Sequence, residues 1–105
     1  MPTIAPPRIH IQGAGSSKRI VELAGATTVG RAPDNAIVLD DTSVSRSHAI
    51  LLMEDGEVLL LDLESSNGTL VNGRPALPDE PIRLIDGDVV MIGRVLLRYE
   101  VPHDP

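Results

Sequence analysis

Residues 49–63 consist of two apolar runs joined by Asp55-Gly56, and read AILLMEDGEVLLLDL. Neither run reaches the ten or so residues of a typical helix, so their length favours strands. Asp-Gly between two apolar segments is a strong signal for a tight β-hairpin turn. The stretch therefore predicts two paired strands, over 49–53 and 58–63, whose continuous apolar character is typical of strands buried on both faces.

Short segments of the same kind fill the rest of the chain. Apolar and polar residues alternate over 8–12, 19–23 and 95–101, and Gly, Pro or polar clusters separate these runs. Asn72-Gly73 and Asp86-Gly87 predict further tight turns. About ten or eleven short strands at close spacing, without a long amphipathic segment, predict an all-β fold, an antiparallel β-sandwich.

Length and composition predict one domain with an aliphatic core. The 105 residues include 13 Leu, 10 Val and 9 Ile, but Tyr99 is the only aromatic residue. This excess of β-branched residues also favours strands. We expect the domain to cover 7–101, with flexible, Pro-rich ends at 1–6 and 102–105. The absence of Cys excludes disulfides, thiolate metal sites and cysteine nucleophiles.

The charge balance argues against two classes of partner. Nine basic and 15 acidic residues give a net charge of -6. Nucleic acids and anionic membranes attract clustered Lys and Arg, so neither is an expected partner. The sequence contains no membrane-spanning run and no signal pattern, which predicts a cytoplasmic location. Its three scattered His residues have no metal-ligand spacing, so no metal and no cofactor is expected.

The most specific feature is an ordered series of polar and glycine-rich motifs. The series runs Gly30-Arg31, then Ser45-Arg46-Ser47-His48, then Ser66-Asn67-Gly68-Thr69, then Val71-Asn72-Gly73. In this order and spacing the motifs resemble those of the forkhead-associated (FHA) domain, a phosphothreonine-recognition module. The resemblance extends from about Ile9 to Val101. It implies an FHA-like sandwich that binds a phosphothreonine-containing protein, such as a Ser/Thr-kinase substrate, in signalling or regulation.

The chemistry of these residues agrees with a phosphate ligand. A phosphorylated side chain carries about -1.5 to -2 charge and three acceptor oxygens. Arginine guanidinium groups match phosphate oxygens bidentately, and serine hydroxyls are short donors. Two or three charge-assisted hydrogen bonds of roughly 1.5–3 kcal/mol each would supply much of the ~8 kcal/mol of a micromolar complex.

The resemblance implies five binding residues. Arg31 would contact the phosphate or brace the residues that do, Ser45 would donate to a phosphate oxygen, and Arg46 would supply a second cation. Ser66 would line the pocket near the threonine methyl group, and Asn67 would hydrogen-bond the main chain of the peptide. Six further residues would support the site: Gly30, His48, Gly68, Thr69, Asn72 and Gly73. Among these, His48 would tie the Ser45 loop to neighbouring backbone.

The sequence alone does not explain how these motifs meet. In a simple up-and-down meander, the loops on either side of a strand over 36–39 would lie at opposite ends of it. Four residues would then separate Arg31 from Ser45 by about 13 Å. Asp40 and Asp41, in the second of these loops, are expected to be solvated. The resemblance implies that the loop before Ser45 reads the third residue after the phosphothreonine. Because this loop, 40–44, is acidic, we expect it to disfavour an acidic residue there and to tolerate apolar or basic ones.

Two alternatives remain beside the phosphopeptide hypothesis. The same fold could be a phospho-independent interaction or oligomerisation module that uses an exposed apolar sheet face. A hydrolase that uses Ser45 and His48 is disfavoured, because residues three apart on one strand point to opposite faces. No Gly-x-Ser-x-Gly nucleophile motif is present either. The sequence therefore predicts a binding module and not an enzyme.

Overall fold

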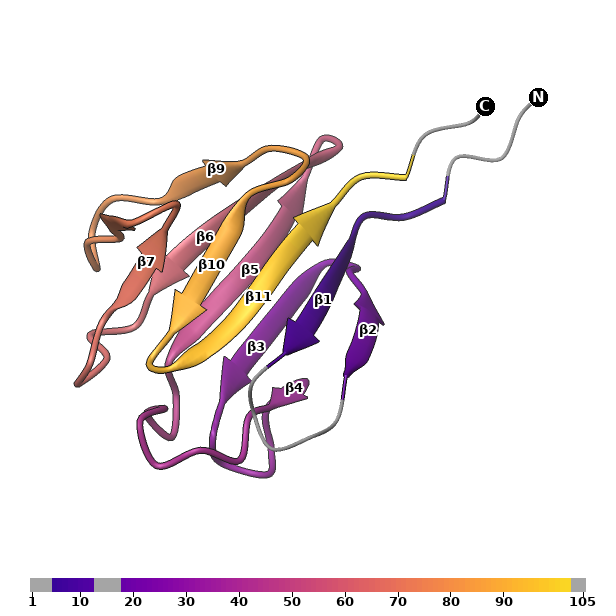
Figure 1. Cartoon of the computed structure of the whole chain (residues 1–105). Coiled ribbons are helices and arrows are strands. Elements are labelled where there is room, and N and C mark those ends of the chain that lie inside the picture. The colour runs from indigo at the N-terminus through magenta and orange to yellow at the C-terminus, as the bar shows by residue number, and fades with distance from the viewer. Residues whose placement is uncertain (1–4, 13–17, 103–105) are drawn as a thin grey trace.

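The computed structural model describes residues 5–12 and 18–102, which form eleven strands and no helix (Figure 1). The strands are β1 (Arg8–Gln12), β2 (Arg19–Glu22), β3 (Ala26–Gly30), β4 (Ile37–Val38), β5 (Ala49–Glu54), β6 (Glu57–Asp62), β7 (Thr69–Val71), β8 (Arg74–Pro75), β9 (Ile82–Leu84), β10 (Val89–Ile92) and β11 (Val95–Glu100). In these two described ranges no helix could cross a membrane.

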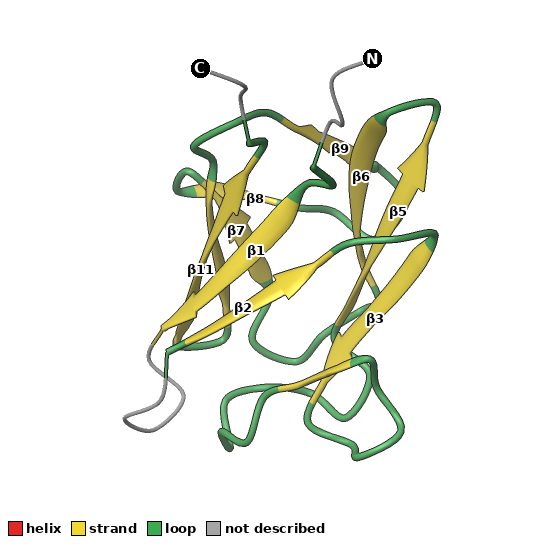
Figure 2. Cartoon of the chain, turned by 90° about the vertical axis from the view of Figure 1, so that its right-hand side faces the viewer, coloured by secondary structure: helices red, strands yellow, loops and turns green. Residues whose placement is uncertain are grey.

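The strands form two sheets that pack face to face (Figure 2). One sheet has the order β2-β1-β11-β10-β7-β8 and the other has the order β4-β3-β5-β6-β9. This arrangement confirms the predicted all-β sandwich. Every pair whose register is defined is antiparallel, with one exception: β4 runs parallel to β3. The parallel pairing of β4 with β3 determines at which end of the sandwich the loops before and after β4 lie.

The hairpin predicted from residues 49–63 is confirmed. Strands β5 and β6 pair from Ala49↔Asp62 to Glu54↔Glu57. Asp55 and Gly56 have φ angles of 51° and 78°, the positive pair that a tight two-residue turn requires. The expectation of burial on both faces is wrong. Residues of β5 and β6 that point outward are half-buried at most, because no described segment covers that side of the sheet.

The core between the sheets is aliphatic, as the composition predicts. Its largest fully buried side chains are Tyr99, Ile9, Ile11, Leu23, Ile37, Leu39, Leu60, Ile92 and Leu97. Each such side chain contributes roughly 1.5–3 kcal/mol through burial.

The turns at Asn72-Gly73 and Asp86-Gly87 are also confirmed, with positive φ at Asn72, Gly73 and Gly87. Residues 1–4, 13–17 and 103–105, which include most of the predicted flexible ends, lie outside the described residues.

The carboxylate of Glu100, at the end of β11, makes the free energy of unfolding depend on pH in the acid range. Hydrogen bonds from His10 and then Arg8 lower the pKa of Glu100 from 4.5 to about 2. Because the unfolded chain binds this proton at higher pH, the stabilisation is complete above pH 4.5 and is lost as the pH falls toward 2. Glu100→Gln is therefore expected to flatten the rise of unfolding free energy across this window, measured by urea denaturation.

The matched control is Glu57→Gln. Glu57 forms an exposed ion pair with Arg83 at 3.3 Å, and exposed pairs contribute little. We expect this variant to keep the parent's acid slope. An unchanged slope in Glu100→Gln would show that the Glu100 contacts do not stabilise the fold.

Candidate functional site

Three loop segments meet at one end of the sandwich (Figure 2). Strand β3 ends where β5 begins, since Val29 pairs with Ala49, and β6 ends there too, since Ala49 pairs with Asp62. In the other sheet, β7 begins where β10 ends, through the Ile92↔Thr69 pair. The segments 31–48 and 63–68 and the turn at 93–94 therefore lie at the same end. All the motifs except Val71-Asn72-Gly73 lie in these loops or in the strand residues beside them.

The parallel strand β4 explains why Arg31 and Ser45 are neighbours. Val29 pairs with Ile37 and Gly30 with Val38, so β3 and β4 finish at the same end of the sheet. The meander that would separate the two loops is thus not formed. Instead, the Arg31 N–H donates to the Ser45 carbonyl at 2.9 Å, and the Ala32 N–H donates to the Arg46 carbonyl at 3.2 Å.

Gly30 makes this close approach possible. A Cβ atom at Gly30 would lie 2.2 Å from the Arg46 carbonyl oxygen, a backbone atom with little freedom to move. The side chain of Asn35 completes the junction. Its Nδ2 group donates to the carbonyls of Arg46 at 2.8 Å and Ala32 at 2.9 Å. The 30–35 and 45–46 segments are therefore held together by both main-chain and side-chain hydrogen bonds.

His48 is fully buried and links two of the loops. Its Nδ1 atom accepts the Ser45 N–H at 3.0 Å, so the ring proton is on Nε2, which donates to the Gly68 carbonyl at 3.0 Å. The Ser45 hydroxyl oxygen accepts the Ser66 N–H at 2.9 Å. The hydroxyl proton of Ser45 therefore remains available to an external acceptor.

A buried carboxylate shapes the 63–68 loop. Asp62 accepts hydrogen bonds from the Ser65 N–H at 3.1 Å, from the Ser65 hydroxyl, and from the buried Thr69 hydroxyl at 2.7 Å. Burial by itself raises the pKa of Asp62, but these hydrogen bonds outweigh it and hold the pKa below its usual range. The ionised carboxylate thus fixes the backbone that leads into Ser66 and Asn67.

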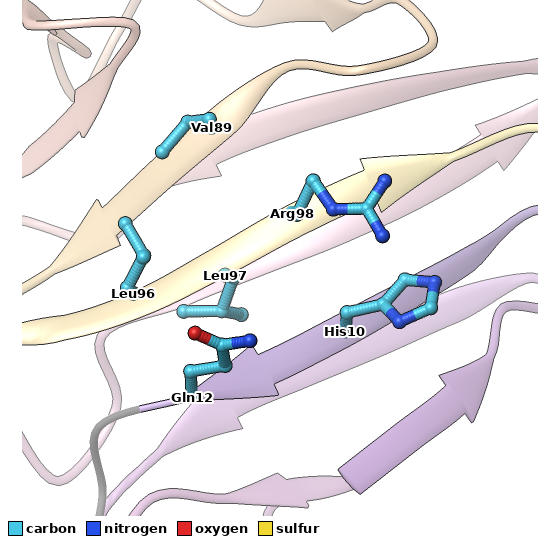
Figure 3. A pocket seen from close by; sticks show the side chains of 6 residues that line it. All are labelled: His10, Gln12, Val89, Leu96, Leu97 and Arg98. Atoms are coloured by element: carbon cyan, nitrogen blue, oxygen red, sulfur yellow. The ribbon is translucent and has the colours of Figure 1, made fainter. Parts of the chain in front are cut away.

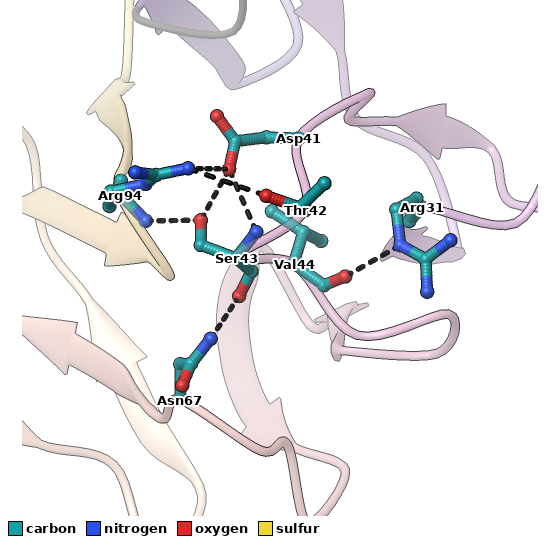
Figure 4. Close-up of polar contacts among 7 residues, drawn as sticks. All are labelled: Arg31, Asp41, Thr42, Ser43, Val44, Asn67 and Arg94. Carbon is teal, nitrogen blue, oxygen red and sulfur yellow. Dashed lines mark hydrogen bonds and ion pairs between the residues drawn. The ribbon is translucent and has the colours of Figure 1, made fainter.

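Two guanidinium groups supply positive charge. The Nε atom of Arg31 donates to the Val44 carbonyl at 3.1 Å, which directs the side chain while leaving its Nη groups without a partner among the described residues (Figure 4). Arg46 is exposed, and in the described ranges its side chain makes no hydrogen bond or ion pair. Both groups are free to bind an anion.

Asn67 lies beside an open groove. Its Nδ2 group donates to the Ser43 carbonyl at 2.9 Å, which leaves its carbonyl oxygen as an acceptor (Figure 4). The groove has a volume of about 470 Å³ and is lined by Thr42, Ser43, Asn67, Gly93 and Arg94. An amide acceptor at the edge of a groove is suited to main-chain N–H groups of an extended peptide.

The acidic loop 40–44, which contributes Thr42 and Ser43 to the lining of this groove, is held by hydrogen bonds and an ion pair. Asp41 accepts from the N–H and hydroxyl of Ser43 at 2.8 and 2.6 Å, and it pairs with Arg94 at 3.3 Å (Figure 4). Hydrogen bonds from Ser43, aided by Arg94, lower the pKa of Asp41. The expectation of a merely solvated carboxylate is therefore wrong for Asp41.

Together these loops offer hydroxyl donors, two cations and an amide acceptor at one end of the sandwich. Such a set can bind a dianionic group together with the main chain that carries it. The described part of the chain contains no group of three His, Asp or Glu residues that could hold a metal ion.

Comparison with known proteins places this chain in a family. The FHA domain family model matches residues 27–93, well over half of the chain. The chain belongs to the FHA family. It is 41% identical over 88 residues to the glycogen accumulation regulator GarA of Mycolicibacterium smegmatis, covering 84% of this chain and 54% of GarA. It is also 38% identical over 88 residues to the oxoglutarate dehydrogenase inhibitor of Corynebacterium diphtheriae, covering 84% of this chain and 59% of that protein.

Solved FHA domains share the architecture. A structure from a study of phosphothreonine-dependent FHA domain interactions aligns with a TM-score of 0.80 and 33% identity, covering 92% of this chain and 99% of that one. The FHA domain of FhaA, complexed with the intracellular domain of Rv3910, aligns with a TM-score of 0.79 and 32% identity over 90% of this chain and 99% of that one. This FHA domain spans about half the length of the curated relatives.

Most of the predicted site residues lie together in the FHA domain. Arg31, Ser45, Arg46, Ser66 and Asn67 all lie on the loops at one end, and Gly30, His48, Gly68 and Thr69 lie beside or beneath them. Asn72 and Gly73 lie at the other end of β7. There the Asn72 side chain donates to Asp88 and accepts the Val89 N–H, both at 2.9 Å, so this turn braces β10.

Four contributors to the FHA loop frame were not predicted. They are Asn35, Asp62, Gly93 and Arg94. The sequence offers one usable signal, since Asp62 ends an apolar strand and has Ser65 three residues later, a spacing that allows a local carboxylate–backbone bond. Gly93 and Arg94 contact residues more than ten positions away, and so does Asn35 through Arg46, although Asn35 also bonds the nearby Ala32. Nothing local in the sequence indicates the distant contacts.

Proposed function

We propose that this FHA domain binds a phosphothreonine-containing segment of a partner protein through Arg31, Ser45, Arg46, Ser66 and Asn67. The observation that carries the proposal is the hydrogen bond from the Ser66 N–H to the Ser45 hydroxyl oxygen, at 2.9 Å. This bond joins the two serine loops and leaves the Ser45 proton for a phosphate oxygen. The Nη groups of Arg31 and Arg46 supply the charge-assisted bonds.

The binding energy must come from this local set of donors. The whole chain has a net charge of -6 and repels a phosphorylated ligand at long range. Two or three charge-assisted hydrogen bonds, each contributing about 1.5–3 kcal/mol, are enough for much of a micromolar affinity. The neutral His48 acts only through the backbone that it holds.

We further propose that the protein is not an enzyme. Nucleophilic catalysis needs a base within hydrogen-bond reach of the serine hydroxyl. Both ring nitrogens of His48 are occupied by backbone groups, one by the Ser45 N–H and the other by the Gly68 carbonyl. The role of the protein is then to recruit a Ser/Thr-kinase substrate in the cytoplasm. It would do so within a regulatory system of the kind that the names of GarA and the dehydrogenase inhibitor indicate.

The direct test is a titration with three degenerate peptide pools at moderate salt: phosphothreonine, phosphoserine and unphosphorylated threonine. Binding to the phosphothreonine pool alone would support the proposal and would show that the threonine methyl group is read. Binding to no pool by a folded protein would overturn it, and would favour the alternative of a phospho-independent interaction module.

Peptide selectivity should depend on the pairing of Asp41 with Arg94. In the parent protein the Arg94 charge is balanced by Asp41, while Asp40 remains exposed, so an acidic residue three positions after the phosphothreonine gains nothing. Asp41→Asn removes that balance and keeps an acceptor for Ser43. We expect the preference for an acidic third residue over alanine to rise about two- to fivefold, the range of an exposed ion pair.

The measurement is fluorescence anisotropy with matched phosphopeptides that differ only at the third residue. Asp55→Asn, a change in the β5–β6 turn, should leave the preference unchanged. If Asp41→Asn also leaves it unchanged, Arg94 does not contact that part of the peptide.

A further inference from the structure

The outer face of the β2-β1-β11-β10-β7-β8 sheet carries two rows of side chains defined by strand register. Partners in register point to the same side of the sheet. The row nearer the loops consists of Leu70, Met91, Leu96 and Gln12. The next row consists of Val89, Arg98, His10 and Ile20. Neither row contains a carboxylate, and no described segment covers them.

A hollow of about 110 Å³ lies between these rows, large enough to take one aliphatic side chain (Figure 3). Val89 and Leu96 form its exposed apolar part, the buried Leu97 also lines it, and His10, Gln12 and Arg98 form a polar rim. Leu96 and Leu70 are 37% and 38% exposed, so the apolar surface continues beyond the hollow. The hollow is therefore part of a wider apolar patch with a polar border on one side.

The electrostatics of the rim favour an anionic ligand group. Arg98 has no hydrogen-bond or ion-pair partner among the described residues. Glu100, two residues further along β11 on the same face, is already engaged by Arg8 and by His10, the latter at 2.9 Å. The Arg98 guanidinium, without a partner in the part of the chain that the structure describes, thus lies beside an apolar hollow. It complements a carboxylate adjacent to an aliphatic side chain.

We propose that this face is a phosphate-independent docking surface for an acidic segment of a partner protein. In such a complex a branched aliphatic side chain of the partner enters the hollow, and a neighbouring carboxylate pairs with Arg98. A second copy of this chain fits less well. A symmetric contact centred on the hollow would oppose two Arg98 side chains, and neither row contains a carboxylate to pair with them.

This surface is distinct from the phosphopeptide site, so the inference does not rest on the proposed function. The two are nevertheless close, because Arg94, which lines the groove beside Asn67, lies in the turn before β11, two residues before Leu96 and at most about 7 Å from it along the chain. A partner that presents both features could therefore engage both surfaces at once and gain affinity by multivalency.

The test uses N-acetyl-leucine, which has an isobutyl group and a carboxylate, as a minimal probe in NMR titrations of the full chain. We expect saturable amide shifts confined to residues 10, 12, 89 and 96–98, with a Kd on the order of millimolar for a ligand this small. N-acetyl-leucinamide lacks the carboxylate and should bind about three- to fivefold more weakly. Arg98→Gln should weaken binding of the acid to the same extent.

Two variants serve as controls. Arg83→Gln removes an exposed arginine from the other sheet, and Arg31→Ala removes the cation of the phosphopeptide site, so both should bind the probe as the parent does. Equal shifts with the acid and the amide, shifts spread over the whole surface, or unchanged binding by Arg98→Gln would overturn the proposal. A concentration-dependent dimer in sedimentation velocity that Leu96→Glu abolishes would also overturn it, by assigning this face to a second copy.

Discussion

Arg31→Ala is expected to weaken phosphothreonine-peptide binding by roughly 10- to 150-fold. This range corresponds to the ~1.5–3 kcal/mol of a charge-assisted hydrogen bond to the phosphate. The backbone contact from the Arg31 N–H to Ser45 is kept in the variant, so the loop retains one of its anchors. Isothermal titration calorimetry with one phosphothreonine peptide measures the loss, and thermal unfolding shows whether the fold is intact.

Arg31→Lys separates charge from geometry. Lysine keeps the positive charge but lacks both the guanidinium fork and the Nε donor that Val44 accepts. We expect an intermediate affinity for this variant. Arg83→Ala, at an exposed position of the other sheet, should bind as the parent does. Parent-like affinity in Arg31→Ala would mean that the phosphate lies elsewhere.

Gly30→Ala is expected to lower the free energy of unfolding by about 3 kcal/mol or more, a large value for the addition of one methyl group. The new Cβ would lie 2.2 Å from the Arg46 carbonyl oxygen, so the 30–32 and 45–46 segments would have to separate. That movement would break the main-chain bonds of Arg31 and Ala32. The folded fraction of the variant should therefore also lose phosphopeptide binding.

Gly56→Ala is the matched control. Gly56 has φ of 78° in the β5–β6 turn, and its Cβ would meet nothing within 4 Å. Only conformational strain applies there, at about 1–2 kcal/mol, and peptide binding should be unaffected. Urea denaturation of both variants gives the comparison. Equal losses would show that the approach of the two loops at Gly30 can relax without cost.

Local sequence was enough to predict the strands and turns of this domain. Asp55-Gly56 and Asn72-Gly73 each leave two residues between paired strands and adopt positive φ there, so these turns are visible from residue type without tertiary information. The aliphatic core followed from composition, because few other residues could fill it. The burial of β5 and β6 on both faces was predicted wrongly, since an apolar run does not reveal whether a second layer exists to cover it.

The proposed binding residues were chosen from chemistry and motif order, but their convergence was not predicted. Arg31 and Ser45 are brought together by β4, a strand of only two residues whose parallel pairing with β3 is a non-local choice. A local pattern of two apolar residues carries no information about strand direction. The same reason hides the contact of Asn35 with Arg46 and the contacts of Gly93 and Arg94, because these partners are distant in sequence.

The sequence by itself thus determined that the chain forms an aliphatic all-β sandwich and carries the donors for a phosphate. These properties depend on residue type and on spacing over a few positions. The tertiary structure alone decided that His48 is the neutral link between two loops, that Asp41 is paired with Arg94, and that Arg98 borders an open hollow. Each of these depends on strands far apart in the chain becoming neighbours, which only the packed fold specifies.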